Sequence, residues 1–192
     1  MAYLILVRHG ESEWNEKGLW TGWTDVGLTE KGKEEAKKAA HEIKDVPVDV
    51  AFTSDLKRAH DTLTIILHEL GKDQITVTVA PELKEKSYGD LAGKNKWELK
   101  EKYGEEQWMK WRRAWNEPIP NGETLKIVYE RVVPYYTDHI LPLLEQGKNV
   151  IVAAHGNSIR ALLKYLESIS DEDIAGIEFP TGTALIFLFS IK

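Results

Sequence analysis

The sequence contains no cysteine, and this absence removes several kinds of chemistry at once. Without thiols the chain forms no disulfide, no thiolate metal site and no cysteine nucleophile. Long apolar runs are also missing, since no segment approaches the roughly 20 residues of a membrane-spanning helix. The amino terminus enters an apolar stretch without a basic, cleavable leader. We therefore expect a cytoplasmic protein that does not bind membranes.

Surplus positive charge is lacking as well. The chain has 25 lysines and arginines against 31 aspartates and glutamates, which gives a formal net charge of -6. Nucleic-acid-binding proteins usually have an excess of lysine and arginine side chains on one face, so a polyanionic partner is not expected. Four of the few arginines, at positions 8, 58, 112 and 113, instead lie beside expected strand ends or in a tryptophan-rich helix. This placement predicts a local site for a small anion.

The apolar pattern alternates between strands and helices along the whole chain. A length of 192 residues with 42% hydrophobic content predicts one domain over residues 1–192. Expected strands cover 2–7, 48–53, 75–79, 150–154 and 184–191, and expected helices cover 29–43, 54–71, 97–116, 125–145 and 159–166. A break is expected near Gly104, and Pro134 and Pro142 are expected to bend or end parts of the helix over 125–145. The alternation predicts an α/β fold, a three-layer α/β/α sandwich with a mainly parallel central sheet.

Two of the apolar strands end in the same dipeptide, His-Gly. His9 follows the first strand and His155 follows the strand at 150–154. Open α/β sheets bind ligands at the carboxyl ends of their strands, so the two histidines are expected to meet there. A neutral imidazole such as His9 can attack phosphorus, and the adjacent Arg8 can hold phosphate oxygens with two parallel donors. The pattern predicts phosphate chemistry.

The residues after His155 strengthen this interpretation. They begin a helix, so the free amides around Gly156 and Asn157 would face a bound phosphate. A pair of histidines can alternatively bind a metal ion. Neither histidine belongs to an HExxH-type pair, however, and no carboxylate is spaced to complete such a site. We therefore expect no metal.

Several further segments, taken together with these, resemble a known family. The segments cover 8–15, 21–29, 52–59, 83–96, 111–113, 154–158 and 180–182, and so span nearly the whole chain. They resemble the histidine phosphatase superfamily, and in particular its cofactor-dependent phosphoglycerate mutases. A bare Arg-His-Gly is common to many phosphatases. Lys96 and the pair Arg112-Arg113 are the parts that resemble the mutase branch.

The resemblance implies a role for each matched residue. His9 is implied as the nucleophile that becomes phosphohistidine, with Arg8, Arg58 and His155 stabilising the transferring group and Glu85 as proton donor and acceptor. The other matched residues are implied to hold the carboxylate, hydroxyl or second phosphate of the substrate: Ser12, Asn15, Thr21, Gly22, Tyr88, Lys96, Arg112, Arg113, Gly156 and Asn157.

The implied activity is interconversion of 3-phosphoglycerate and 2-phosphoglycerate in glycolysis and gluconeogenesis, through a phosphohistidine enzyme and a 2,3-bisphosphoglycerate intermediate. The implied cofactor is 2,3-bisphosphoglycerate as the priming phosphate donor, without a metal. The partners are then small-molecule phosphoglycerates, and the chain is expected to be a monomer or a small homo-oligomer.

Two alternatives stay open from the sequence. Long family members carry an insertion after the paired arginines and a tail after the last strand, whereas here residues 116–124 lead directly into the next helix and the chain stops at Lys192. A shorter cover over the site favours a histidine-dependent phosphatase acting on small phosphorylated metabolites. A non-catalytic sensor of phosphorylated ligands is the third possibility, and it predicts an incomplete catalytic set.

Overall fold

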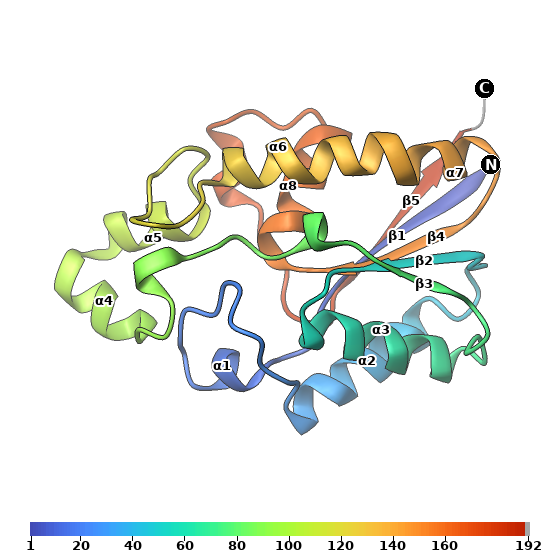
Figure 1. The fold of residues 1–192 in the computed structure, drawn as a ribbon, viewed down its shortest axis with the longest axis horizontal. Coiled ribbons are helices and arrows are strands. Elements are labelled where there is room, and N and C mark those ends of the chain that lie inside the picture. Colours follow the sequence, from blue (N-terminus) through green and yellow to red (C-terminus); the bar gives the residue numbers. More distant parts are fainter. Residues whose placement is uncertain (191–192) are drawn as a thin grey trace.

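The computed structural model describes residues 1–190, and a five-stranded sheet lies at its centre (Figure 1). The strands are adjacent in the order β3-β2-β4-β1-β5. Four of them are parallel, and β5 runs antiparallel to β1 at one edge. The sheet confirms the predicted α/β class. The strand bounds are β1 (Ala2–Arg8), β2 (Val50–Thr53), β3 (Val77–Val79), β4 (Val150–Ala154) and β5 (Ala184–Phe189).

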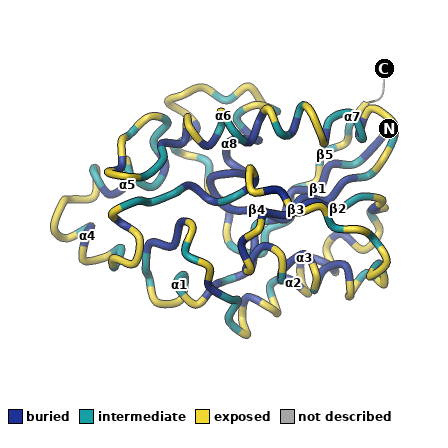
Figure 2. The backbone as a smooth tube through the Cα atoms, in the orientation of Figure 1, coloured by how far each residue is buried: buried dark blue, intermediate teal, exposed yellow. Residues whose placement is uncertain are grey.

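Helices cover both faces of this sheet (Figure 1). One face carries α2 (Glu30–Glu42) and α3 (Lys57–Glu69), and the other carries α6 (Leu125–Tyr135), α7 (Leu141–Glu145) and α8 (Gly156–Leu166). Side chains of β1 alternate between the two layers: Ile5 and Val7 belong to the core under α2 and α3, and Leu4 and Leu6 to the core under α6 and α8. In Figure 2 the inner strands β1, β2 and β4 are mostly buried, whereas the edge strands and the outer faces of the helices are more exposed.

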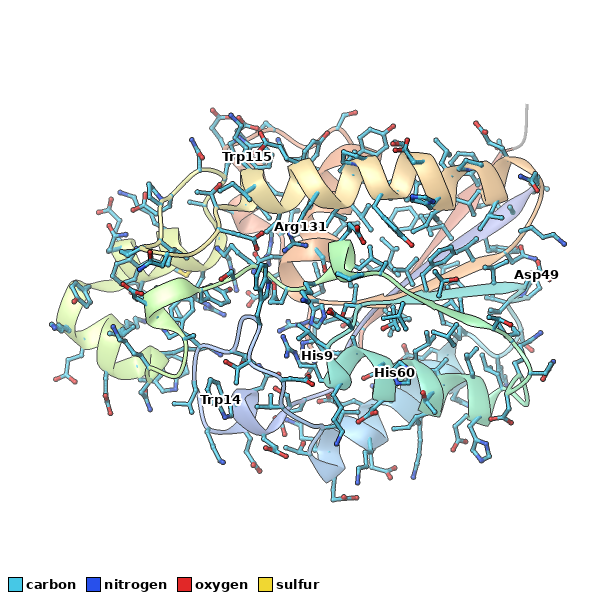
Figure 3. All side chains as sticks on the ribbon, viewed as in Figure 1. His9, Trp14, Asp49, His60, Trp115 and Arg131 are labelled. Carbon is cyan, nitrogen blue, oxygen red and sulfur yellow. The ribbon has the colours of Figure 1, made fainter. Side chains whose placement is uncertain are left out.

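The register of β1 and β4 places the two His-Gly turns next to each other. Arg8 lies opposite Ala154 in the parallel pairing, so His9 and His155 leave the sheet at the same edge. The backbone N–H of His9 donates to the carbonyl oxygen of Ala154 at 3.0 Å, which continues the ladder into the turn. In Figure 3, His9 lies at the opposite end of the sheet from Asp49, which precedes β2.

Beyond that edge of the sheet lies a separate arm, at the left of Figure 1. It consists of α4 (Lys96–Tyr103) and α5 (Glu105–Arg113), with the short α1 (Glu13–Glu16) below it. Gly104 separates the two longer helices at a positive φ of 84°, which confirms the predicted break. The arm has its own small core, formed by Trp20, Leu91, Leu99, Trp108 and Ile119.

Several predicted boundaries are wrong. The helix that carries Arg58 begins at Lys57 instead of residue 54, because the Ser54 hydroxyl accepts the Leu56 N–H and forms a turn first. Helix α8 begins directly at Gly156, earlier than the predicted residue 159. Strands β2 and β3 each start two residues late, and β5 ends at Phe189. Ile191, the predicted end of the last strand, lies outside the described residues.

The helical prediction for the tryptophan-rich segment is also wrong in part. The spacing predicts that Trp115 shares a helical face with Trp108 and Trp111, but α5 ends at Arg113, and Trp115 packs edge-on against Tyr129 of α6. The predicted helix over 125–145 is divided into α6, a π-helical turn (Tyr136–Ile140) and α7, which agrees with the expected effect of Pro134 and Pro142. The four-residue α1, capped by Ser12 and Asn15, has no counterpart among the predicted helices. Of residues 1–190, no helix is both long and apolar enough to cross a bilayer.

The turn after β1 depends on a close approach of two glycines. A Cβ added to Gly10 would lie 2.1 Å from the carbonyl oxygen of Gly32, in the first turn of α2. The Gly10 N–H also donates to the Thr62 hydroxyl of α3 at 3.0 Å. Any side chain at position 10 therefore has to displace backbone, which moves α2 away from the edge of the sheet that carries His9.

Gly10→Ala is expected to lower the free energy of unfolding by about 2–3 kcal/mol, because the new methyl group overpacks a rigid backbone contact. Urea denaturation followed by circular dichroism measures the change. Gly176→Ala is the matched control, since a Cβ there meets nothing within 4 Å, and its effect should stay within about 0.5 kcal/mol. Equal stability of the two variants would contradict the packing argument.

Candidate active site

The backbone at the turn fixes the protonation state of His9. The Nδ1 atom of His9 lies 2.7 Å from the Gly10 carbonyl oxygen. A carbonyl only accepts, so Nδ1 carries the proton and Nε2 keeps its lone pair. The Arg58 Nε–H donates to that Nε2 at 3.3 Å, which agrees with this tautomer. Burial, followed by the charges of Arg58 and Arg8, holds the pKa of His9 well below its usual value. His9 is thus a neutral imidazole with Nε2 available for attack.

His155 lies directly beside His9. The two ring centroids are 5.1 Å apart, and the rings are tilted by 57°. The Nε2 atom of His155 is 2.7 Å from the Ser54 hydroxyl, which anchors the ring to the end of β2. Burial and the charge of Arg58 lower the pKa of His155 well below its usual value as well. Among the described residues, its Nδ1 is a buried nitrogen that has no hydrogen-bond partner.

Two arginines from different elements surround the histidine pair. Arg58, in the first turn of α3, is buried and donates to the carbonyl oxygens of Gly22 and Thr24 at 2.7 and 3.1 Å. Burial lowers its pKa to about 10, so it stays charged at neutral pH. Arg8 donates through Nη1 to the carbonyl oxygen of Phe179 at 2.7 Å, and its Nε is buried without a partner in the described part of the chain. Both guanidinium groups are therefore held in place by backbone carbonyls.

Glu85 reaches the same edge from the segment between β3 and α4. Its Oε1 accepts the backbone N–H of Lys86 at 2.8 Å and that of Asn157, at the start of α8, at 3.0 Å. Burial by itself would raise the pKa of Glu85, but these hydrogen bonds and the charges of Arg58 and Arg8 outweigh it and leave the pKa below its usual value. Glu85 is consequently ionised in the free protein and able to accept a proton.

The arm contributes three cationic side chains to the pocket that contains His9. Lys96 begins α4, while Arg112 and Arg113 end α5, and all three line the pocket with His9 and Arg58. Burial and the charge of Arg112 lower the pKa of Lys96 to about 8. The Arg112 guanidinium lies over the Trp108 ring, 4.3 Å from its centroid. Two sets of cationic groups therefore line the pocket, one around His9 and one from the arm.

The other predicted site residues divide into those in the pocket wall and those behind it. Asn15, Thr21, Gly22, Tyr88, Gly156 and Asn157 line the pocket. Ser12 and His155 do not appear in the wall: Ser12 is fully buried and caps α1 by hydrogen bonding to Asn15, and His155 lies behind the wall next to His9. Burial raises the pKa of Tyr88 to about 12, so its hydroxyl keeps its proton and accepts a bond from the Asn157 amide.

Sequence reasoning missed three cations that support the site, of which Lys86 and Arg160 are buried and Arg131 is partly buried. Lys86 is buried, with a pKa lowered by burial to about 7, and donates to the Trp111 carbonyl oxygen at 2.7 Å, which fixes the end of α5. Arg131 of α6, labelled in Figure 3, donates to the Glu85 carbonyl oxygen at 2.9 Å. Arg160 donates to the Asn157 side chain at 2.8 Å. A correct start for α8 would have revealed Arg160, because it lies one turn after Asn157.

The arrangement suits an anion better than a metal ion. Within residues 1–190 there is no group of three or more histidines and carboxylates placed to hold a metal. Cationic side chains instead converge on the pocket together with the N-terminal amides of α8. A histidine pair at the carboxyl edge of a parallel sheet, enclosed by arginines, is the site of an anion-binding α/β protein.

Comparison with known proteins places the chain in a family. A family model described as "Histidine phosphatase superfamily (branch 1)" matches residues 4–190. The chain belongs to this superfamily, as the sequence predicts. The Shigella flexneri alpha-ribazole phosphatase structure has a similar fold, with a TM-score of 0.79 and 27% identity over 96% of this chain and 89% of that one.

Two curated relatives are considerably more similar in sequence. A protein of Cytophaga hutchinsonii is 49% identical over 192 residues, covering 100% of this chain and 90% of its own length. One of Nitrobacter hamburgensis is 50% identical over 186 residues, covering 96% of this chain and 90% of its own length. Both are named 2,3-bisphosphoglycerate-dependent phosphoglycerate mutase.

The lowered pKa values of His9 and His155 predict how stability changes with pH. In the unfolded chain a histidine has a pKa of about 6.5. Below that pH the unfolded chain binds protons at these histidines, whereas the folded protein does not. The free energy of unfolding that the pair contributes above pH 6.5 is therefore lost as the pH falls. Each histidine contributes up to about 1.4 kcal/mol per pH unit.

Urea unfolding between pH 7.5 and 5.5 should therefore show a steadily falling free energy of unfolding. A His155→Gln variant should show a shallower decline, because it has lost one of the two groups. A free energy that is constant or rises toward pH 5.5 would contradict the neutral state assigned to the pair.

Proposed function

We propose that the protein interconverts 3-phosphoglycerate and 2-phosphoglycerate through a phosphorylated His9, as an isomerase of glycolysis and gluconeogenesis. The observation that carries the proposal is the second cationic group of the pocket, Lys96 with Arg112 and Arg113, which faces the same space as His9. A substrate with a phosphate at one end and a carboxylate at the other requires donors at both ends. The names of the relatives that share half of the sequence support the same activity.

In this proposal, His9 carries the phosphoryl group on Nε2. When a substrate hydroxyl oxygen attacks, the new P–O bond forms as the P–N bond breaks, and the bonding pair returns to the imidazole. Arg8 and Arg58 stabilise the oxygens of the transferring group, together with the free Nδ1 side of His155. These donors are already held by backbone carbonyls and by Ser54, so little reorganisation is needed at the moment of transfer.

Glu85 handles the proton of that hydroxyl. Because it is ionised in the free protein, it can accept the proton as the oxygen attacks phosphorus. Phosphates bound between Arg8 and Arg58 offset the positive charges that lower its pKa, so the carboxyl group keeps the proton more readily in the complex. In the reverse transfer the protonated Glu85 returns it to the leaving oxygen.

The pocket also fits 2,3-bisphosphoglycerate, which supplies the first phosphoryl group to an unphosphorylated enzyme when it is bound. The Arg8 Nε–H is buried and unpaired within the described residues, which leaves a donor for a phosphate oxygen in the pocket that contains His9. Lys96, Arg112 and Arg113 would hold the second anionic end. A histidine-dependent phosphatase acting on small phosphorylated metabolites is the alternative, since it would use the His9 end alone.

An assay of 3-phosphoglycerate with and without 2,3-bisphosphoglycerate, with free phosphate followed in parallel, separates the two activities. The proposal predicts formation of 2-phosphoglycerate that is stimulated by the bisphosphate and exceeds phosphate release. Phosphate release without isomerisation would support the phosphatase instead.

His9→Ala should abolish the acid-labile phosphoenzyme, and a label that persists in this variant would refute the assigned nucleophile.

Glu85→Gln is expected to slow turnover by about a hundredfold or more, because the amide preserves the shape of the side chain but accepts no proton. Steady-state kinetics with saturating substrate measure this loss. Phosphoenzyme formation from 2,3-bisphosphoglycerate should also slow, since its leaving oxygen requires a proton. A turnover equal to that of the parent protein would remove Glu85 from the mechanism.

A further inference from the structure

The Glu178 carboxylate pairs with the Arg113 guanidinium, one of the cations that the arm contributes to the pocket. Six cationic side chains line the pocket: Arg8, Arg58, Lys96, Arg112, Arg113 and Arg160. Among the described lining residues only Glu85 and Glu178 are acidic. Glu85 interacts with the amides near His9, whereas Glu178 forms an ion pair with the Arg113 guanidinium on the arm. The Glu178 carboxylate therefore lies where a carboxylate or phosphate of a ligand would bind Arg113.

The backbone around Glu178 is anchored, while its side chain is free to move. Arg160 donates to the carbonyl oxygen of Ile177 at 2.9 Å, and Arg8 donates to that of Phe179 at 2.7 Å. The Glu178 side chain is 65% exposed, against 10% for Arg113. Its carboxylate can consequently rotate into solvent without moving the chain, whereas the Arg113 guanidinium stays in the pocket wall.

The charge state of Glu178 suits competition with an anion. The hydrogen bond from Arg113 holds the pKa of Glu178 below its usual value despite some burial, so the carboxylate is ionised at neutral pH. An anionic ligand that reaches Arg113 has to replace this carboxylate. A ligand that binds only beside His9 leaves the Glu178–Arg113 ion pair intact, because the Glu178 carboxylate is paired with Arg113 and with neither Arg8 nor Arg58.

We propose that Glu178 is a specificity-determining residue, whose carboxylate competes with the second anionic group of the substrate for Arg113. This inference rests on the function proposed above. The competition weakens binding of every ligand that uses both ends of the pocket, product included, and leaves binding at the His9 end unchanged. Glu178 thereby lowers the affinity for phosphoglycerates without taking part in phosphoryl transfer.

Glu178→Gln tests the proposal, because the amide keeps the size of the side chain and removes its charge. At low ionic strength, where surface charges are least screened, the KM for 3-phosphoglycerate should fall about two- to fivefold, the range expected for one exposed ion pair. The kcat should stay within about twofold of the parent value, because Glu178 takes no part in phosphoryl transfer. Inhibition by orthovanadate, a small phosphate mimic bound at the His9 end, should be unchanged.

Glu172→Gln is the matched control, since it removes the same charge from an exposed position that does not line the pocket. An equal fall in KM for this variant would show a general charge effect and overturn the proposal. A KM of Glu178→Gln that is unchanged or higher would also overturn it, while the proposed function would stand if the parent protein isomerises 3-phosphoglycerate. A parent protein that binds vanadate but does not isomerise would instead refute the proposed function.

Discussion

The hydrogen bond from the His9 ring to the Gly10 carbonyl oxygen is the interaction on which the rest of the site depends. It assigns the proton to Nδ1 and leaves Nε2 directed toward the Arg58 guanidinium and the pocket. The geometry requires glycine at position 10, because the turn passes within contact distance of Gly32 in α2. The packing of one helix against a sheet edge thus determines which nitrogen of His9 can react.

A second constraint is the excess of positive charge around the pocket of a protein that is acidic as a whole. The net charge of the chain is -6, yet arginines from β1, α3, α5 and α8 face one pocket. Burial lowers the pKa of several of them, which reflects a cost that bound phosphate or carboxylate can offset. The two acidic groups in the wall take complementary positions, with Glu85 beside the amides near His9 and Glu178 on the arm.

Local sequence pattern predicts the layers of the fold and the reactive edge of its sheet. Apolar strands ending in His-Gly identify that edge, and the alternation of strands with helices predicts the three layers. The cations that support the site could not be predicted from the sequence pattern, because their contacts are distant along the chain. Lys86, for example, donates to the carbonyl oxygen of Trp111, which lies 25 positions away, and periodicity indicates only local structure. Trp115 is misplaced because α5 ends two residues before it. Glu178 lies in a loop, where only the packed structure shows that it meets Arg113.

The position of the phosphate on the His9 ring shows whether the Gly10 carbonyl oxygen determines which nitrogen reacts. Protein labelled with ¹⁵N-histidine can be phosphorylated by 2,3-bisphosphoglycerate and examined by ¹⁵N and ³¹P NMR. We expect a phosphorus–nitrogen coupling to Nε2 of His9, with Nδ1 still protonated against the Gly10 carbonyl oxygen. A phosphoryl group on Nδ1, or on another histidine, would contradict it.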